Sequence, residues 1–177
     1  MDGDNKIPNY DLFNKSAIIT GASRGLGAAI AKMMWMAGAN LMLVDKEQVA
    51  LNEVISSLEY RLKQNKNPLY IDLCAPDATD LILKSAKEFF DHLDILVNNA
   101  AIQGPVGPSW ENDWDFWKMT LNIDLLAPFD LSRCCAAWMI HQSRGKIICL
   151  SGGVATSSRP NFSAYWLEPD YLFQMVS

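Results

Sequence analysis

Residues 17–27 read AIITGASRGLG, and this stretch decides the fold. A short apolar, β-branched run meets glycines at positions 21, 25 and 27, and a helical pattern follows. This order predicts a strand, a tight turn and a helix. Glycines let a backbone turn sharply and approach a pyrophosphate, and the free N–H groups that begin a helix attract phosphate oxygens. We therefore expect a dinucleotide to be bound by Thr20, Gly21, Ser23, Arg24, Gly25, Leu26 and Gly27.

The rest of the chain alternates strand and helix patterns. Apolar runs predict strands at 16–20, 41–44, 69–71, 95–97 and 146–150. Helical spacing predicts helices at 26–37, 48–64, 77–92 and 112–141, the last with a possible break near Pro128. This alternation indicates an α/β fold with a doubly wound parallel sheet, Rossmann-like, in strand order 3-2-1-4-5. We divide the chain into a lead-in (1–15), the Rossmann-like domain (16–165) and a divergent tail (166–177).

Composition excludes several classes of protein. The 177 residues are 50% hydrophobic, and the net charge of −5 without a basic stripe argues against nucleic acid as a partner. No apolar run is long enough to span a membrane, and the N-terminus lacks an apolar signal core, so we expect a cytoplasmic protein. The four cysteines have no metal-ligand spacing, which predicts buried reduced thiols and no metal site. His92 and His141 lie at the ends of helical patterns, and we assign them no catalytic role.

Two further stretches add to the glycine turn. Asn98-Asn99-Ala100-Ala101 follows the fourth predicted strand, and RPNFSAY (159–165) follows the fifth. With TGASRGLG (20–27), they resemble the motifs of the short-chain dehydrogenase/reductase family, classical type, with Ala101 in place of the family's glycine. The resemblance implies hydride transfer between a nicotinamide and a carbonyl or alcohol. It also implies that Asn98, Asn99 and Ala100 support the floor of the cofactor site.

Asp45 ends the second predicted strand, 24 residues after Gly21. An acidic residue near this distance binds the ribose hydroxyls of NAD and repels the 2′-phosphate of NADP. A helix cap or turn role is the alternative for Asp45. Arg24 and Lys46 favour NADP instead, but the resemblance gives the acidic residue more weight, so we expect NAD to be preferred and NADP to remain possible. In the family, a motif like Asp72-Leu73 lines the adenine pocket, although Asp72 also fits a turn at a strand end.

The resemblance places the catalytic residues late in the chain. Tyr165 matches the tyrosine that moves the proton, and Ser151 stands next to Gly152, which occupies the serine position. Asp124 best matches the asparagine that supports a proton-relay water, since Asn122 lies on a different helical face. YWLEP (165–169) stands where Tyr-x-x-x-Lys belongs, so Pro169 replaces the lysine that lowers the tyrosine's pKa.

The resemblance ends abruptly after Tyr165. Family members continue with a dimer-forming helix, further strands and a substrate loop, so we interpret this chain as a truncated, frameshifted or alternatively spliced product in which that dimer helix is incomplete. Family members are usually homo-oligomers, and Trp114 and Trp117 are interpreted as core or subunit-contact residues. The first functional hypothesis is an NAD(P)-dependent oxidoreductase acting on a small alcohol or carbonyl. The alternatives are a catalytically inactive dinucleotide-binding or interaction module and a non-functional truncated product.

Overall fold

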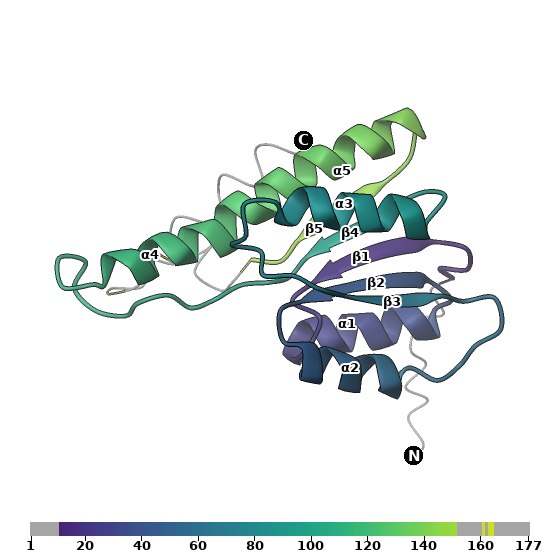
Figure 1. Ribbon diagram of the computed structural model, residues 1–177, viewed down its shortest axis with the longest axis horizontal. Helices are drawn as coiled ribbons and strands as arrows, with labels where there is room; N and C mark the ends of the chain where they lie inside the picture. Colours follow the sequence, from purple (N-terminus) through teal and green to yellow (C-terminus); the bar gives the residue numbers. More distant parts are fainter. Residues whose placement is uncertain (1–10, 152–160, 162, 165–177) are drawn as a thin grey trace, which may run out of the picture.

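The sheet at the centre of the molecule has five parallel strands in the order β3-β2-β1-β4-β5, which confirms the predicted doubly wound fold (Figure 1). The structure is a computed structural model that describes residues 11–151, 161, 163 and 164. The strands are β1 (Ser16–Thr20), β2 (Asn40–Asp45), β3 (Lys66–Tyr70), β4 (Ile95–Asn98) and β5 (Lys146–Cys149). The helices are α1 (Gly25–Met36), α2 (Gln48–Ser57), α3 (Ala78–Phe89), α4 (Trp114–Leu121), the π-helical η1 (Asn122–Leu126) and α5 (Ala127–His141).

Helices cover both faces of the sheet. Helices α1 and α2 lie on one face, and α3 and α5 lie on the other (Figure 1). Alternate residues of a strand point to opposite faces, so Ile19 of β1 packs in the cluster that contains Trp35, while Ile18 packs with Ile82 and Leu131. Strands β1 and β2 are buried on both faces, which explains why their sequences are continuously apolar.

The second helix is shorter than its sequence pattern predicts, because α2 ends at Ser57 and not at 64. Leu58 adopts an extended backbone, and its side chain is buried. The following chain is held against the end of α1: Trp35 Nε1 donates a hydrogen bond to the Glu59 carbonyl (2.8 Å), and Gln64 Nε2 donates to the Trp35 carbonyl (2.9 Å). These tertiary contacts override a helical pattern that periodicity alone supports.

The third strand begins at Lys66, earlier than the predicted start at 69. Register places Pro68 opposite Leu43 of β2. Proline lacks the N–H that a central strand needs, but β3 lies at the edge of the described sheet, where this loss is tolerated.

The predicted helix at 112–141 is three consecutive segments, α4, η1 and α5. Asp113 is the N-cap residue of α4, and its side chain accepts a hydrogen bond from the Phe116 N–H (2.6 Å). Pro128 does not break the helix, because it occupies the first turn of α5, where no N–H donor is required. The π-helical segment just before it holds Asp124 in a buried position.

Several smaller expectations are corrected. Of the two roles expected for Trp114, the core role is excluded and the subunit-contact role stays a prediction: Trp114 is 63% exposed and stacks on the half-buried Trp117 with ring centroids 5.0 Å apart. Of the four free cysteines, only Cys135 is buried, and the others are partly exposed. Within the described ranges, no helix is both long and apolar enough to cross a bilayer.

Candidate functional site

The turn after β1 is packed so closely that side chains are excluded from two of its glycines. A Cβ on Gly27 would lie 2.1 Å from the Gly21 carbonyl oxygen, and a Cβ on Gly21 would lie 2.7 Å from Ala100 Cα. Gly25, with φ +54°, is different, because a Cβ there would meet nothing within 4 Å. Since α1 begins at Gly25, this open space lies at the positive end of the helix dipole. Such a position suits a phosphate group.

The segment after β4 supports this turn through four hydrogen bonds. Thr20 Oγ1 accepts from the backbone N–H groups of Asn99 (3.1 Å) and Ala100 (3.2 Å). Asn99 Nδ2 donates to the carbonyls of Thr20 (3.0 Å) and Gly21 (2.9 Å). Asn98 points elsewhere and donates to Ser132 Oγ of α5 (2.9 Å), so the two adjacent asparagines have different structural roles.

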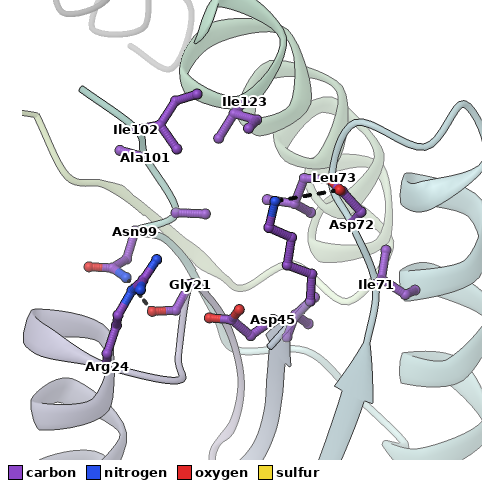
Figure 2. A pocket seen from close by; sticks show the side chains of 13 residues that line it. Gly21, Arg24, Asp45, Ile71, Asp72, Leu73, Asn99, Ala101, Ile102 and Ile123 are labelled. Carbon is purple, nitrogen blue, oxygen red and sulfur yellow. Dashed lines mark hydrogen bonds and ion pairs between the residues drawn. The ribbon is translucent and has the colours of Figure 1, made fainter. Parts of the chain in front are cut away.

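A cavity of about 230 Å³ opens at the carboxyl ends of the strands, beside the glycine turn (Figure 2). Its lining contains eight of the predicted cofactor residues: Gly21, Arg24, Asp45, Lys46, Asp72, Leu73, Asn99 and Ala100. The sequence analysis missed five more: Val44, Ile71, Ala101, Ile102 and Ile123. Three of these residues, Val44, Ile71 and Ala101, directly precede or follow predicted site residues at strand ends, and that adjacency is the signal that could have identified them.

Asp45 forms one wall of the cavity and also joins two loops. Its Oδ2 accepts from the Ser23 N–H (3.0 Å) in the glycine turn, and its Oδ1 accepts from the Glu47 N–H (3.0 Å) before α2. The turn role and the ligand role that were alternatives for Asp45 are therefore compatible. Each carboxylate oxygen has two acceptor positions, so these bonds leave capacity for ligand hydroxyls.

Lys46 and Asp72 form an ion pair at the same end of the cavity, with Nζ 3.7 Å from Oδ2, and both side chains are about half exposed (51% and 49%). The other oxygen of Asp72, Oδ1, accepts from the Cys74 N–H (3.0 Å). Asp72 is thus a turn residue that also lines the cavity. Partial burial, and next the nearby Asp72 charge, raise the pKa of the Cys74 thiol, whereas Lys46 lowers it.

The other predicted cofactor residues lie behind or beside the cavity wall. Ser23 is buried, and among the described residues its Oγ has no hydrogen-bond partner. Leu26 is 61% exposed on the first turn of α1.

The structure describes two of the three predicted catalytic residues, Asp124 and Ser151, and neither is among the residues that line the cavity. Asp124 is buried in η1, and its Oδ1 accepts from the Ile102 N–H (2.8 Å), which fixes one wall of the cavity to the helix. Ser151 is exposed and follows the end of β5 closely. Tyr165 lies outside the described residues, as does Pro169.

Sequence reasoning also missed a contact just before Tyr165. Ser163 Oγ lies 3.2 Å from both Asn112 Nδ2 and Trp117 Nε1, each of which donates to it. The Gly107 N–H donates to the Asn161 carbonyl (2.9 Å). No sequence pattern signals these bonds, because they join segments far apart in the chain. The described residues contain no group of three or more histidine, cysteine or acidic side chains able to hold a metal ion.

Known proteins match this chain over most of its length. The sequence model described as short chain dehydrogenase matches residues 15–166. The chain is 32% identical over 157 residues to a short chain dehydrogenase of Pseudocercospora fijiensis, covering 87% of this chain and 50% of that protein. It is 33% identical over 153 residues to a fatty acyl-CoA reductase of Acinetobacter baylyi, covering 85% and 51%. The chain therefore spans about half the length of these curated relatives.

Solved structures give the same result. A protein assigned as a short-chain alcohol dehydrogenase from Sinorhizobium meliloti superposes with a TM-score of 0.85 at 28% identity, over 94% of this chain and 66% of that one. An NAD+-bound xylitol dehydrogenase superposes with a TM-score of 0.81 at 25% identity, over 88% and 60%. The strand order, the glycine turn backed by Asn99 and these matches lead to one conclusion: the chain belongs to the short-chain dehydrogenase family of oxidoreductases.

Proposed function

We propose that this chain binds a nicotinamide dinucleotide in the cavity at the carboxyl ends of the strands, with NAD preferred, and that it serves hydride transfer to or from a small alcohol or carbonyl. The observation that carries the proposal is the open space at Gly25, which lies at the start of α1 next to a cavity lined by Asp45 and Asp72. A superposed relative that is described as NAD+-bound supports it.

Each part of the cavity suits a different part of the ligand. The N–H groups and dipole of α1 would hold the pyrophosphate, and the tight packing at Gly27 keeps them in place. Asp45 would accept hydrogen bonds from the adenosine ribose, and Ile71 with Leu73 offers apolar surface to the adenine. When bound, the nicotinamide supplies or accepts the hydride. The bond from Ile102 to Asp124 would position the wall on that side.

Proton transfer is assigned to Tyr165, with Ser151 holding the substrate oxygen and Asp124 supporting the relay, as the family resemblance implies. An unperturbed tyrosine has a pKa of about 10, so little phenolate exists at neutral pH without a neighbouring cation. The sequence has Pro169 at the position of that cation. This observation favours a second candidate function for the chain itself, which is dinucleotide binding without turnover.

Calorimetric titration with NAD, NADH and NADP tests the binding, and a panel of alcohols and ketones tests the turnover. We expect Gly25→Ala to weaken NAD binding by about tenfold or more, because its methyl group occupies the phosphate space. Gly107→Ala is the matched control: Gly107 also has a positive φ (+146°) and room for a Cβ, which would meet only Asn112 at 3.5 Å, but unlike Gly25 it does not begin a helix. Binding without turnover would favour the second candidate. A folded chain that binds none of the three dinucleotides would disprove both.

A further inference from the structure

One end of the cavity holds two acidic side chains and a lysine, Asp45, Asp72 and Lys46. Asp45 is the last residue of β2, Lys46 follows it directly, and Asp72 lies just beyond the end of the neighbouring strand β3. The ion pair between Lys46 and Asp72 crosses from one strand end to the other, as the dashed line to Asp72 in Figure 2 shows. Anything bound between these strand ends therefore meets this pair.

Both carboxylates accept backbone hydrogen bonds, whereas the Lys46 ammonium group is held by its ion pair with Asp72. Asp45 accepts two backbone N–H groups at 3.0 Å each, and Asp72 accepts the Cys74 N–H at 3.0 Å. Lys46 has a long flexible side chain, and its only ion pair among the described residues is the one with Asp72. A half-exposed pair of this length is weak, so a ligand charge can compete for the ammonium group.

We propose that Asp72 is a positioning residue for dinucleotide choice, which acts through Lys46. By pairing with Lys46, Asp72 holds the ammonium group towards β3 and away from the ribose side of Asp45. A free ammonium group there would partly neutralise the carboxylate that repels a 2′-phosphate, and it would attract that phosphate itself. Asp72 thus preserves the preference for NAD that Asp45 creates. This inference rests on the proposed function, since it needs a bound dinucleotide.

A double-mutant cycle on the ratio of dissociation constants, NADP over NAD, tests the inference. Asp72→Asn retains an oxygen for the Cys74 N–H but loses the charge, so the turn keeps its bond. We expect it to lower the ratio by about two- to fivefold, in keeping with a weak exposed pair. In the Lys46→Met background the same change is expected to lower the ratio by clearly less. Contacts of Asp72 with the adenine cancel in the ratio, because NAD and NADP share the adenine.

Asp115→Asn is the matched control, because Asp115 pairs with Lys118 at 2.7 Å on α4 and is not in the cavity lining. It is expected to leave the ratio unchanged. An equal effect of Asp72→Asn in both backgrounds would show a direct charge effect without Lys46, and would overturn the inference while leaving the proposed function intact. If the parent chain binds neither dinucleotide, the proposed function fails first and the inference fails with it.

Discussion

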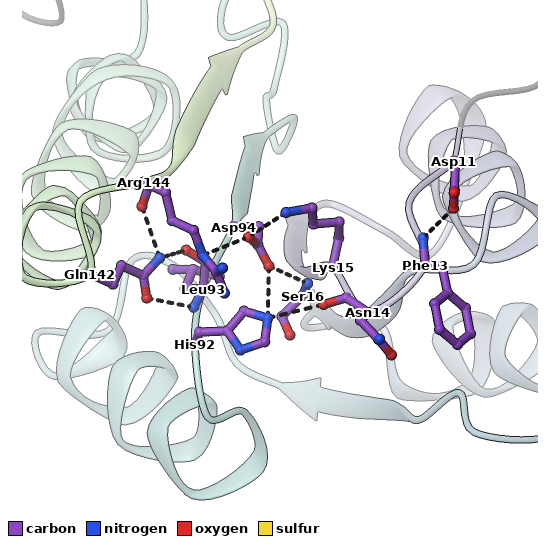
Figure 3. Close-up of polar contacts among 10 residues, drawn as sticks. All are labelled: Asp11, Phe13, Asn14, Lys15, Ser16, His92, Leu93, Asp94, Gln142 and Arg144. Atoms are coloured by element: carbon purple, nitrogen blue, oxygen red, sulfur yellow. Dashed lines mark hydrogen bonds and ion pairs between the residues drawn. The ribbon is translucent and has the colours of Figure 1, made fainter.

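The two ends of the sheet hold carboxylates in opposite situations. At the carboxyl ends of the strands, Asp45 and Asp72 line a cavity and are partly exposed. At the other end, Asp94 is buried and surrounded by protein groups (Figure 3). It accepts from the Ser16 N–H (3.0 Å) and lies 3.2 Å from Lys15 Nζ, 3.0 Å from His92 Nε2 and 3.2 Å from Arg144 Nε.

This difference separates a structural carboxylate from the two to which we assign a role in ligand binding. Asp94 immediately precedes β4, Lys15 and Ser16 lie at the start of β1, and Arg144 precedes β5, so Asp94 joins the starts of three strands. Its acceptor positions are filled by the fold itself. Asp45 and Asp72 use their oxygens to shape loops, and they keep exposed surface next to the glycine turn. The burial and partners of a carboxylate, and not its residue type, are therefore the reason why we assign the proposed ligand site to the cavity end of the sheet.

The largest expected effect is a loss of stability when a side chain is added where the glycine turn packs tightly. Gly27→Ala should lower the free energy of unfolding by about 3 kcal/mol, because the new Cβ would lie 2.1 Å from a backbone oxygen and 2.4 Å from Asn99 Nδ2. Gly25→Ala should cost only about 1 kcal/mol, since its strain is limited to a positive φ. Urea unfolding measures both. Equal losses for the two variants would contradict this account of the turn.

Asp94→Asn tests the buried carboxylate, at the end of the sheet opposite the cavity. We expect it to lower the free energy of unfolding by about 2 kcal/mol, because Lys15 and Arg144 lose a buried charged partner, though both can return to water. The NADP-to-NAD ratio should not change. Asp115→Asn, at an exposed pair, should leave the free energy of unfolding almost unchanged in the same urea titration. A changed dinucleotide ratio in Asp94→Asn would show that the two ends are coupled.

Asp45→Asn tests a carboxylate that lines the cavity. It should lower the NADP-to-NAD ratio of dissociation constants by about tenfold, or about 1.4 kcal/mol, because the repulsion of a 2′-phosphate is lost. The amide keeps one oxygen for the Ser23 or Glu47 N–H, so unfolding should change by only about 1 kcal/mol. Calorimetry and urea unfolding measure the two effects separately. A large stability loss with an unchanged ratio would make Asp45 a second structural carboxylate.

The sequence predicts local features well and tertiary features poorly. The strand, turn and helix around Gly21–Gly27 follow from neighbouring residues, and the strand order follows from the alternation of elements. The end of α2 at Ser57 does not, because it depends on hydrogen bonds between 59–64 and Trp35. Likewise, Asp45 and Asp72 are visible as strand-end acids, but their different partners depend on loops that meet only in the folded chain.

The smallest expected effect is on the reactivity of the Cys74 thiol, which responds in opposite directions to the charges of Asp72 and Lys46. Burial raises the pKa of Cys74 most, Asp72 raises it further and Lys46 lowers it. Because the thiolate is the reactive form, Asp72→Asn should speed alkylation of Cys74 at pH 8, and Lys46→Met should slow it.

Each change should be about twofold, since the charges are half exposed and screened. Peptide mapping distinguishes Cys74 from the other thiols, and Cys135, whose pKa burial raises to about 12, is the unreactive internal reference. Rates that move in the same direction in both variants would mean that Lys46 and Asp72 do not act on Cys74 as opposite charges. The ion pair that we assign to dinucleotide choice would then lose its independent support.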